Sequence, residues 1–283
     1  MCILTEMCRN YAKGDPKKFV RIAHPLSVIL VFVGTAFFFS LQMFHVVPNL
    51  FGVNTFMYKL GWVAAIFITY NILGNMVACY ITSSSVESLP KDCQVPVPEE
   101  EHLWRYCETC EKLMPPRSWH CILCKCCILK RDHHCSFTAN CIGHNNHRYF
   151  FWFTFYLTLG TSLSLATLFI DAVMEFWPSV TWQLILGVTS SEKSALWFIY
   201  WRYVIMLLNV FAGLFPAHML FYQIQNLKSN STYYKISSRL YNLGFRKNCK
   251  VILGQRGLWT FLSPMLKSPL PHDGTRWPMK QAV

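Results

Sequence analysis

The sequence predicts an all-α polytopic membrane protein with four transmembrane helices and a loop-rich, cysteine-rich domain between the second and the third. Apolar residues make up 53% of the 283 residues and charged residues only 14%, where soluble domains carry about 25%. Four long stretches contain almost no charged residue. Eight of the thirteen cysteines lie between Cys107 and Cys141. Composition therefore argues against an ordinary soluble protein, and the clustered cysteines indicate a specialised segment.

The uncharged stretches set the expected helices. Residues 25–58 hold no Asp, Glu, Lys or Arg, which exceeds the roughly 20 residues of one crossing. The polar break at His45–Asn49 therefore ends the first expected helix. No short apolar region with a cleavage site marks a signal peptide, so we expect this helix to remain as an anchor. The four helices are expected near Pro25–Val47, Phe56–Tyr80, Tyr149–Ile170 and Tyr203–Leu227, with a loop over Val180–Ser194.

Basic residues predict the orientation. Residues 83–148 hold eight Lys and Arg, and residues 228–283 hold ten, whereas the two other loops hold almost none. The positive-inside rule then places both termini and the cysteine-rich segment in the cytosol. The net charge of +12 comes from basic residues that gather in the segments on one side of the membrane. They do not gather on a recognition helix, which argues against a nucleic-acid partner. The expected segments are a cytosolic N-terminus (1–24), helices 1 and 2 (25–82), the cysteine-rich domain (83–148), helices 3 and 4 with a lumenal loop (149–227), and a cytosolic tail (228–283).

The cysteine-rich segment has the spacing of metal sites. Two C-x-x-C pairs stand among histidines, and this spacing lets one turn hold an ion with thiolates. Clustering of this kind argues against a secreted disulfide framework, and no βαβ pattern supports a thioredoxin-like redox pair. Buried free cysteines are the remaining simple alternative. Enough ligands for two structural zinc sites are present: Cys107, Cys110, His120, Cys121, Cys124, Cys127, His134 and Cys141.

The residues left over have the composition of a reactive site. Asp132, His133 and Cys135 supply an orienting group, a base and a nucleophile. A neighbouring imidazole and nearby cations favour the thiolate of such a cysteine. From spacing alone, a site in which all of Asp132 to Cys135 bind metal remains an equal alternative. Cys126 has no role in either interpretation.

The motif Asp132-His133-His134-Cys135 within this frame resembles the DHHC family of protein S-acyltransferases. The match includes every spacing from Cys107 to Cys141 and extends to Leu243–Asn248, Gly254 and Trp259 in the tail. The resemblance implies that one zinc ion is held by Cys107, Cys110, His120 and Cys127, and the other by Cys121, Cys124, His134 and Cys141. It also implies that Cys135 takes an acyl group from palmitoyl-CoA, with His133 as base and Asp132 orienting the base.

The same resemblance implies partners. The acyl group would pass to membrane-proximal cysteines of substrate proteins, at the cytosolic face of the bilayer. Apart from the resemblance, and with no sorting signal to read, we expect the protein in an internal membrane, the Golgi or the endoplasmic reticulum. Four basic residues would either meet the phosphates of CoA or touch anionic lipid headgroups: Lys130, Arg131, Arg148 and Lys228. Asn248 would brace the tail.

Three departures from the family pattern are present. Ser136-Phe137 replace Pro-Trp, and Ala139 replaces an asparagine. Tyr234 replaces the last residue of Thr-Thr-x-Glu. The lost carboxylate leaves a second hypothesis, in which the chain is a membrane scaffold that keeps the zinc platform with weakened catalysis.

Overall fold

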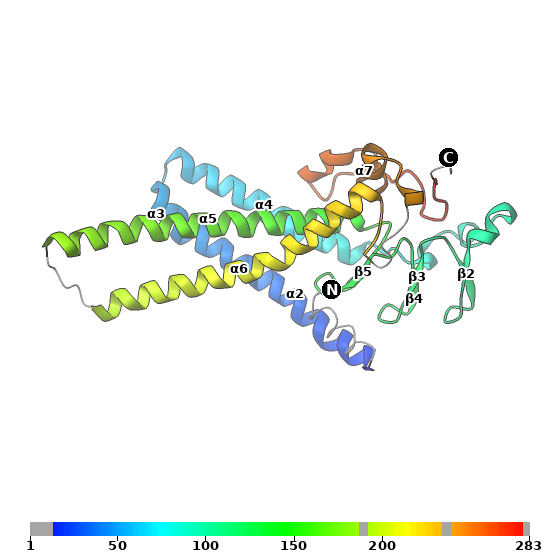
Figure 1. The fold of residues 1–283 in the computed structure, drawn as a ribbon, viewed down its shortest axis with the longest axis horizontal. Helices are drawn as coiled ribbons and strands as arrows, with labels where there is room; N and C mark the ends of the chain where they lie inside the picture. Colours follow the sequence, from blue (N-terminus) through cyan, green and yellow to red (C-terminus); the bar gives the residue numbers. More distant parts are fainter. Residues whose placement is uncertain (1–13, 187–191, 234–238, 280–283) are drawn as a thin grey trace. The chain divides into compact units, whose positions relative to one another are not determined.

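Four long helices and a set of short hairpins make up the computed structural model of the chain (Figure 1). The structure describes residues 14–186, 192–233 and 239–279. The long helical stretches are α2 (Pro16–Leu41) continued by the π-helix η1 (Gln42–Val46) and α3 (Val47–Phe51), then α4 (Phe56–Ile81), α5 (His147–Leu186) and α6 (Glu192–Ser229). Each contains a stretch long and apolar enough to cross a membrane, namely 16–51, 56–81, 147–174 and 200–229. The chain is therefore a multi-pass membrane protein with four candidate spans.

The second helix matches its expected bounds, whereas the others extend beyond theirs. The first helix begins at Pro16 and continues through the expected break to Phe51. Pro48 is tolerated because it lies in the first turn of α3, where its missing N–H is not needed, and a π-helical turn precedes it. The expected loop over Val180–Ser194 is also wrong, because α5 reaches Leu186 and α6 starts at Glu192. Hydropathy reports only the apolar part of a helix, so polar turns beyond the span were not predicted.

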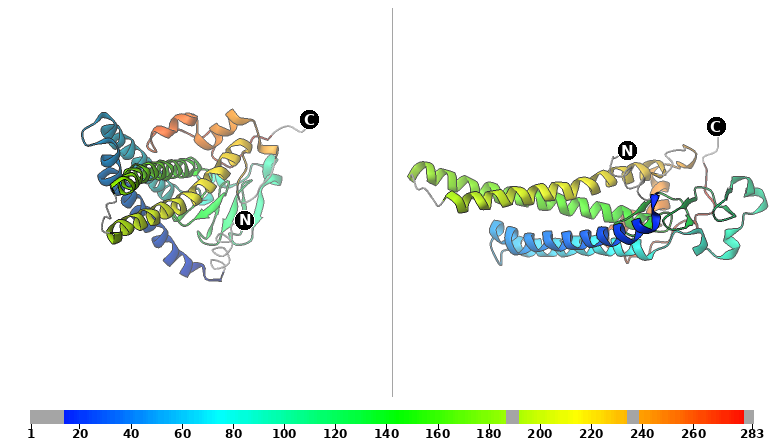
Figure 2. Two further views of the ribbon diagram at one scale, coloured as in Figure 1. Left: turned by 60° about the vertical axis from the view of Figure 1, so that its left-hand side comes forward. Right: turned by 90° about the horizontal axis from the view of Figure 1, so that it is seen from below.

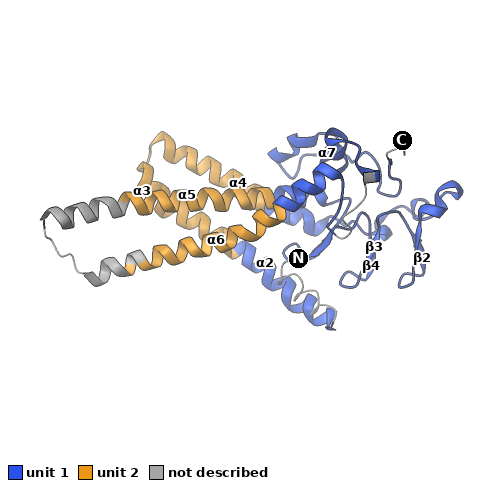
Figure 3. Ribbon diagram, in the orientation of Figure 1, with its two compact units in different colours: residues 1–32, 73–153, 221–283 blue, residues 33–72, 154–220 orange. Residues whose placement is uncertain are grey.

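Two compact units divide the chain, coloured separately in Figure 3. The second unit contains residues 33–72 and 154–220, which are the middle parts of the long helices. In this unit α5 and α6 run side by side (Figure 2), and Asn209 of α6 donates a hydrogen bond to Ser164 Oγ at 2.7 Å. Gln42 also donates to Ser164 Oγ, at 3.0 Å. Polar side chains thus join three helices in an apolar environment where few other partners exist.

The first unit contains residues 1–32, 73–153 and 221–283. Its centre is a series of three two-stranded antiparallel hairpins, formed by β1 (Arg105–Cys107) with β2 (Lys112–Met114), β3 (Trp119–Cys121) with β4 (Cys126–Ile128), and β5 (His133–Cys135) with β6 (Asn140–Ile142). Short 3-10 helices precede them: η2 (Val86–Ser88), η3 (Lys91–Gln94) and η4 (Pro98–Leu103). The tail adds η5 (Arg239–Tyr241), α7 (Phe245–Leu253) and η6 (Gly257–Leu262). The expected loop-rich domain is thus confirmed and contains short hairpins.

Two asparagines fasten the third hairpin to the end of α4. The last carbonyls of a helix have no partner inside the helix. Asn140 Nδ2 donates to the carbonyls of Cys79, Tyr80 and Thr82, at 3.0 to 3.2 Å. Asn146 Nδ2 donates to Thr82 O at 3.0 Å and to Cys141 O at 2.9 Å. These bonds fix β5, which carries His133 and Cys135, against the end of the second candidate span.

The tail is held to α6 by one buried side chain. Asn248 Nδ2 donates to the carbonyl of Lys228 at 2.8 Å, and its Oδ1 accepts from the N–H of Leu243 at 3.1 Å. Asn248 is fully buried. The amide therefore links α7 to the last turn of α6, as the bracing role implied by the resemblance requires.

Replacing Gly143 with alanine is expected to destabilise this region. An added Cβ would lie 2.5 Å from Leu129 O and 2.8 Å from Ser84 Cβ, so the backbone would have to move. Overpacking of this kind costs about 1–3 kcal/mol, and the melting temperature of the purified protein in detergent should fall by about 3–10 °C. Gly34→Ala is the matched control, because nothing lies within 4 Å of its added Cβ. Equal melting temperatures for the two variants would contradict the expectation.

Candidate active site and metal groups

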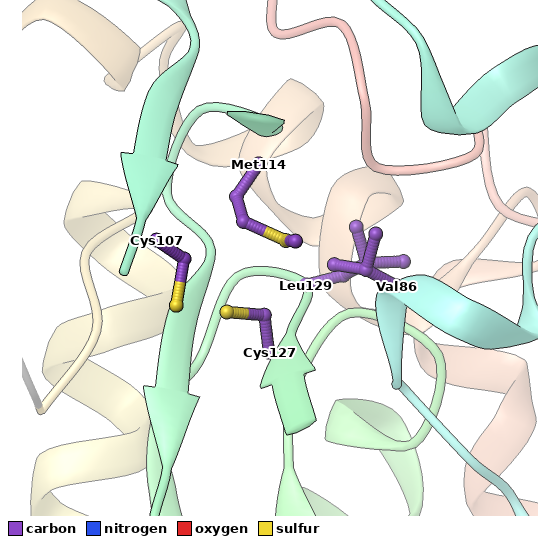
Figure 4. Packing of buried hydrophobic residues seen from close by; sticks show 5 residues of the cluster. All are labelled: Val86, Cys107, Met114, Cys127 and Leu129. Atoms are coloured by element: carbon purple, nitrogen blue, oxygen red, sulfur yellow. The ribbon is translucent and has the colours of Figure 1, made fainter. Parts of the chain in front are cut away.

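The first two hairpins build the first metal-ligand group. Cys107 ends β1 and Cys110 lies in the turn that follows. His120 of β3 faces Cys127 of β4 in the register of the second hairpin. His120 Nδ1 lies 3.3 Å from Cys110 Sγ and 4.0 Å from Cys127 Sγ. Around this group, Val86, Met114 and Leu129 pack against Cys107 and Cys127 (Figure 4), so apolar side chains screen the sulfurs from water.

The second and third hairpins build the second group in the same way. Cys121 ends β3, Cys124 lies in its turn, and His134 faces Cys141 across β5 and β6. His134 Nδ1 lies 3.7, 3.3 and 3.5 Å from the sulfurs of Cys121, Cys124 and Cys141, respectively. The middle hairpin thus contributes ligands to both groups.

Both groups fit a tetrahedral metal ion. In each, the four ligand atoms lie within 4.8 Å of one another. An ion with bonds of about 2.3 Å to sulfur and 2.0 Å to nitrogen would separate two sulfurs by about 3.8 Å and a sulfur from a nitrogen by about 3.6 Å. The sulfur of Cys110 lies 3.9 Å from that of Cys127, and the sulfur of Cys124 lies 3.5 Å from that of Cys141. The structure therefore brings all eight sequence-predicted ligands into two sets of three cysteines and one histidine.

Asp132 is fully buried and accepts four hydrogen bonds. Its Oδ2 accepts from His133 Nδ1 at 2.8 Å and from Gln223 Nε2 at 3.1 Å. Its Oδ1 accepts from Asn226 Nδ2 at 3.2 Å and from the N–H of Tyr233 at 2.6 Å. A carboxylate has about four lone-pair sites, so this set uses all of them. Burial alone would raise the pKa of Asp132, but the bonds from His133 and Tyr233 hold it well below its usual range.

The carboxylate orients His133 toward Cys135. Burial alone would lower the pKa of His133, yet its hydrogen bonds with Asp132 and Cys135 raise that pKa to about 9. Burial would raise the pKa of the Cys135 thiol, and the hydrogen bond from His133 lowers it below its usual value. The pair therefore favours a thiolate beside an imidazolium, with the Asp132 carboxylate behind the ring. Asp132, His133 and Cys135 lie together and are not part of either metal-ligand group.

Sequence reasoning missed the residues that surround Asp132. Gln223 accepts a hydrogen bond from His147 Nε2 at 2.6 Å and donates to Asp132. Asn226 lies one turn further along α6. Both amides stand near the end of a long apolar stretch, and polar side chains in such a position commonly mark function. That signal could have identified them.

His24 makes a second contact that the sequence did not predict. It lies in α2, and its Nε2 is 2.9 Å from Nε2 of His134, with the two rings inclined by 22°. Because Nδ1 of His134 faces the sulfurs, the other ring nitrogen is the one that meets His24. Metal-binding histidines usually donate this second N–H to a protein partner, which fixes the ring.

The four basic residues named as possible phosphate contacts lie in different environments. Lys130 is fully buried, and its Nζ has no hydrogen-bond partner among the residues that the structure describes. Arg148 is buried and donates to Ser268 O at 3.3 Å. Arg131 is half-buried and donates to His120 O at 2.8 Å, whereas Lys228 is exposed. Of the four, Arg131 and Lys228 remain accessible to a phosphate in this conformation.

A family comparison matches the part of the chain that carries this site. The pattern described as DHHC palmitoyltransferase matches residues 100–239, which include all three hairpins and most of α5 and α6. The chain belongs to the DHHC palmitoyltransferase family.

Individual DHHC proteins match over different lengths. The Rattus norvegicus protein named probable palmitoyltransferase ZDHHC24 is 32% identical over 184 residues, covering 60% of this chain and 63% of the relative. An Arabidopsis thaliana protein named probable protein S-acyltransferase 13 is 30% identical over 57% of this chain and 52% of its own length. The Danio rerio palmitoyltransferase ZDHHC16A is 51% identical over 23% of this chain and 18% of its own. The chain thus spans less than two thirds of these relatives.

The departures from the DHHC pattern lie close to Asp132, His133 and Cys135. Ser136, Phe137 and Ala139 all belong to the turn between β5 and β6. Residues 231–234 stand in place of the family's Thr-Thr-x-Glu. In this segment Ser231 donates a hydrogen bond to Asn226 Oδ1 at 3.0 Å, and Tyr233 donates its N–H to Asp132. Tyr234, on which the scaffold hypothesis depends, lies outside the described residues. The backbone of this segment therefore contacts Asp132, whatever its fourth side chain does.

Proposed function

We propose that this chain transfers a long-chain fatty acyl group from acyl-CoA to cysteines of proteins, through a thioester on Cys135. The observation that carries the proposal is the buried Asp132 carboxylate with four donors, which holds His133 against Cys135. A fixed nucleophile, base and orienting group are what acyl transfer through a covalent intermediate needs. Membership of the DHHC family supports the same chemistry.

The first half of the reaction forms the acyl-enzyme. The Cys135 thiolate attacks the carbonyl carbon of the acyl-CoA thioester. The new bond from Cys135 sulfur to carbon forms as the bond from CoA sulfur to carbon breaks, and the CoA thiolate takes the proton from His133. Asp132 keeps the ring oriented and balances its charge while the proton is present.

The second half regenerates the enzyme. A cysteine of the substrate protein gives its proton to His133 and attacks the acyl carbon on Cys135. The bond to Cys135 breaks and the Cys135 thiolate returns. One thioester replaces another in each half, so the bond energies are nearly equal and catalysis depends on activating and positioning the sulfurs. Substrates would be proteins with membrane-proximal cysteines, because the acyl chain is anchored in the bilayer.

The two Cys3His groups support a structural role for zinc. Three thiolates and one imidazole with no open position are the usual ligands of structural zinc. Bound zinc would hold the hairpins in one rigid body. Because the middle hairpin contributes to both groups, we propose that the two ions stabilise one platform. The proposed location is an internal membrane, Golgi or endoplasmic reticulum, with this platform and both termini in the cytosol, based on the basic residues of 83–148 and 228–283.

Incubation with radiolabelled palmitoyl-CoA tests the proposal. Full-length protein purified in detergent should form an acyl adduct that neutral hydroxylamine removes and that peptide mapping places on Cys135. Native mass spectrometry of the same preparation should show two zinc ions per chain. A preparation that holds both ions and forms no such adduct would contradict acyl transfer and favour the scaffold hypothesis.

A further inference from the structure

The three hairpins place equivalent residues at equivalent positions. Cys107, Cys121 and Cys135 each end the first strand, and each faces the first residue of the second strand. The residue four positions after each cysteine has a left-handed backbone, with φ of 53° at Glu111, 57° at Lys125 and 47° at Ala139. A positive φ is uncommon outside glycine, so its recurrence shows that the three turns have the same local conformation.

Two of these turns contribute ligands to the metal-ligand groups, and the third does not. In the first and second turns, the residue three positions after the cysteine is a second cysteine, Cys110 or Cys124. In the third turn that residue is Thr138. The first two turns also receive a histidine and a cysteine from the hairpin that follows, whereas α5 follows the third. Cys135 therefore occupies a metal-ligand position from which the other three ligands are missing.

Thr138 takes the place of the missing second cysteine. It is fully buried, and its Oγ1 has no hydrogen-bond partner among the described residues. In the first two turns the sulfur at this position lies within 4.8 Å of the sulfur of the cysteine that ends the strand, so the shared turn conformation places the Thr138 hydroxyl beside the Cys135 sulfur. The third turn thus presents a buried, unpartnered hydroxyl where the other two turns present a second thiol.

We propose that Thr138 is a further catalytic residue, whose hydroxyl donates a hydrogen bond to the Cys135 sulfur in place of the metal ion that the other two turns would hold. The proposal rests on the proposed acyl transfer through Cys135. A donor to sulfur stabilises it most when it carries negative charge. In the acyl-enzyme the sulfur is a weaker acceptor. The hydroxyl therefore holds Cys135 as the thiolate that attacks acyl-CoA, and it stabilises the same thiolate when the acyl group leaves.

Comparison of Thr138→Val with Thr138→Ser tests this role. Valine keeps the shape and removes the hydroxyl, and serine keeps the hydroxyl. Loss of a hydrogen bond to a charged atom should slow acylation of Cys135 by palmitoyl-CoA about 10- to 100-fold in Thr138→Val. It should slow alkylation of Cys135 by iodoacetamide, followed by peptide mass spectrometry, in the same direction. Thr138→Ser should react within a few-fold of the unsubstituted protein, and every variant should keep two metal ions.

A matched control is Thr109→Val, because Thr109 lies exposed in the turn of the first hairpin. It should change neither rate. If Thr138→Val loses metal, Thr138→Ala and Thr138→Ser give the same comparison, since they differ by one hydroxyl. Equal rates with and without the hydroxyl would overturn the proposal. Alkylation needs no acyl-CoA, so its rate tests the hydrogen bond from Thr138 to Cys135 even if the unsubstituted protein forms no acyl adduct.

Discussion

A Cys135→Ser protein is expected to keep two zinc ions and to form no hydroxylamine-sensitive acyl adduct. Cys135 lies outside both metal groups, so its replacement removes no ligand. A serine hydroxyl is far less acidic than a thiol, and His133 cannot hold it as an anion. Native mass spectrometry measures the metal, and labelled palmitoyl-CoA with peptide mapping measures the adduct. Adduct formation should fall below detection.

Two other cysteines separate this effect from general damage. Cys126 is half-buried, belongs to neither metal group and neighbours Cys127 in β4, so Cys126→Ser should keep both the metal and the adduct. Cys121→Ser removes a ligand and should lose metal. If Cys135→Ser lost metal as Cys121→Ser does, the division between ligands and nucleophile would be wrong.

An Asp132→Asn protein is expected to lose acyl transfer by about 10²- to 10⁴-fold, the usual contribution of a positioned acid–base group. All four partners of Asp132 donate hydrogen bonds, and an asparagine amide has only one acceptor atom. Its NH2 group would face donors, and His133 would lose both its orientation and its countercharge. The rate of adduct formation on Cys135, measured at saturating palmitoyl-CoA, should show this loss.

The matched control is Asp92→Asn, since Asp92 is exposed in η3. It should leave the rate unchanged. A buried amide facing donors also costs stability, about 1–3 kcal/mol, so melting temperature and metal content must be measured alongside. If folded Asp132→Asn protein formed the adduct at a rate within tenfold of the unsubstituted protein, the carboxylate would not be needed to orient His133.

The metal groups were predictable because their information is local. Cys107 with Cys110, and Cys121 with Cys124, lie within single turns, and the spacing alone identifies them as ligands. Their assignment to separate groups needs the hairpin register, which pairs His120 with Cys127 and His134 with Cys141. The resemblance implied that assignment, and spacing by itself left it open.

The partners of Asp132 could not be predicted in the same way. Gln223 and Asn226 are far along the chain and reach Asp132 only because α6 and the third hairpin fold together in the first unit. Charge likewise does not reveal burial. Because Lys130 stands beside the Asp132–Cys135 motif, it was expected to reach a phosphate. Its side chain instead lies inside the protein. Contacts between distant segments and the direction of a side chain both depend on tertiary packing.

The ligands of the two metal groups alternate along the chain, and this alternation sets the order in which the groups are completed during synthesis. The first metal group is complete once Cys127 has left the ribosome, when Cys121 and Cys124 of the second group are already present. The second is complete at Cys141, just before α5 begins at His147. Chains fold from the N-terminus as they emerge. Cys135 is therefore made between these two events, and we expect it to be enclosed in its hairpin before the third span reaches the membrane. The partners that Asp132 receives from Gln223, Asn226 and Tyr233 are made only afterwards, so the surroundings of Cys135 are completed last.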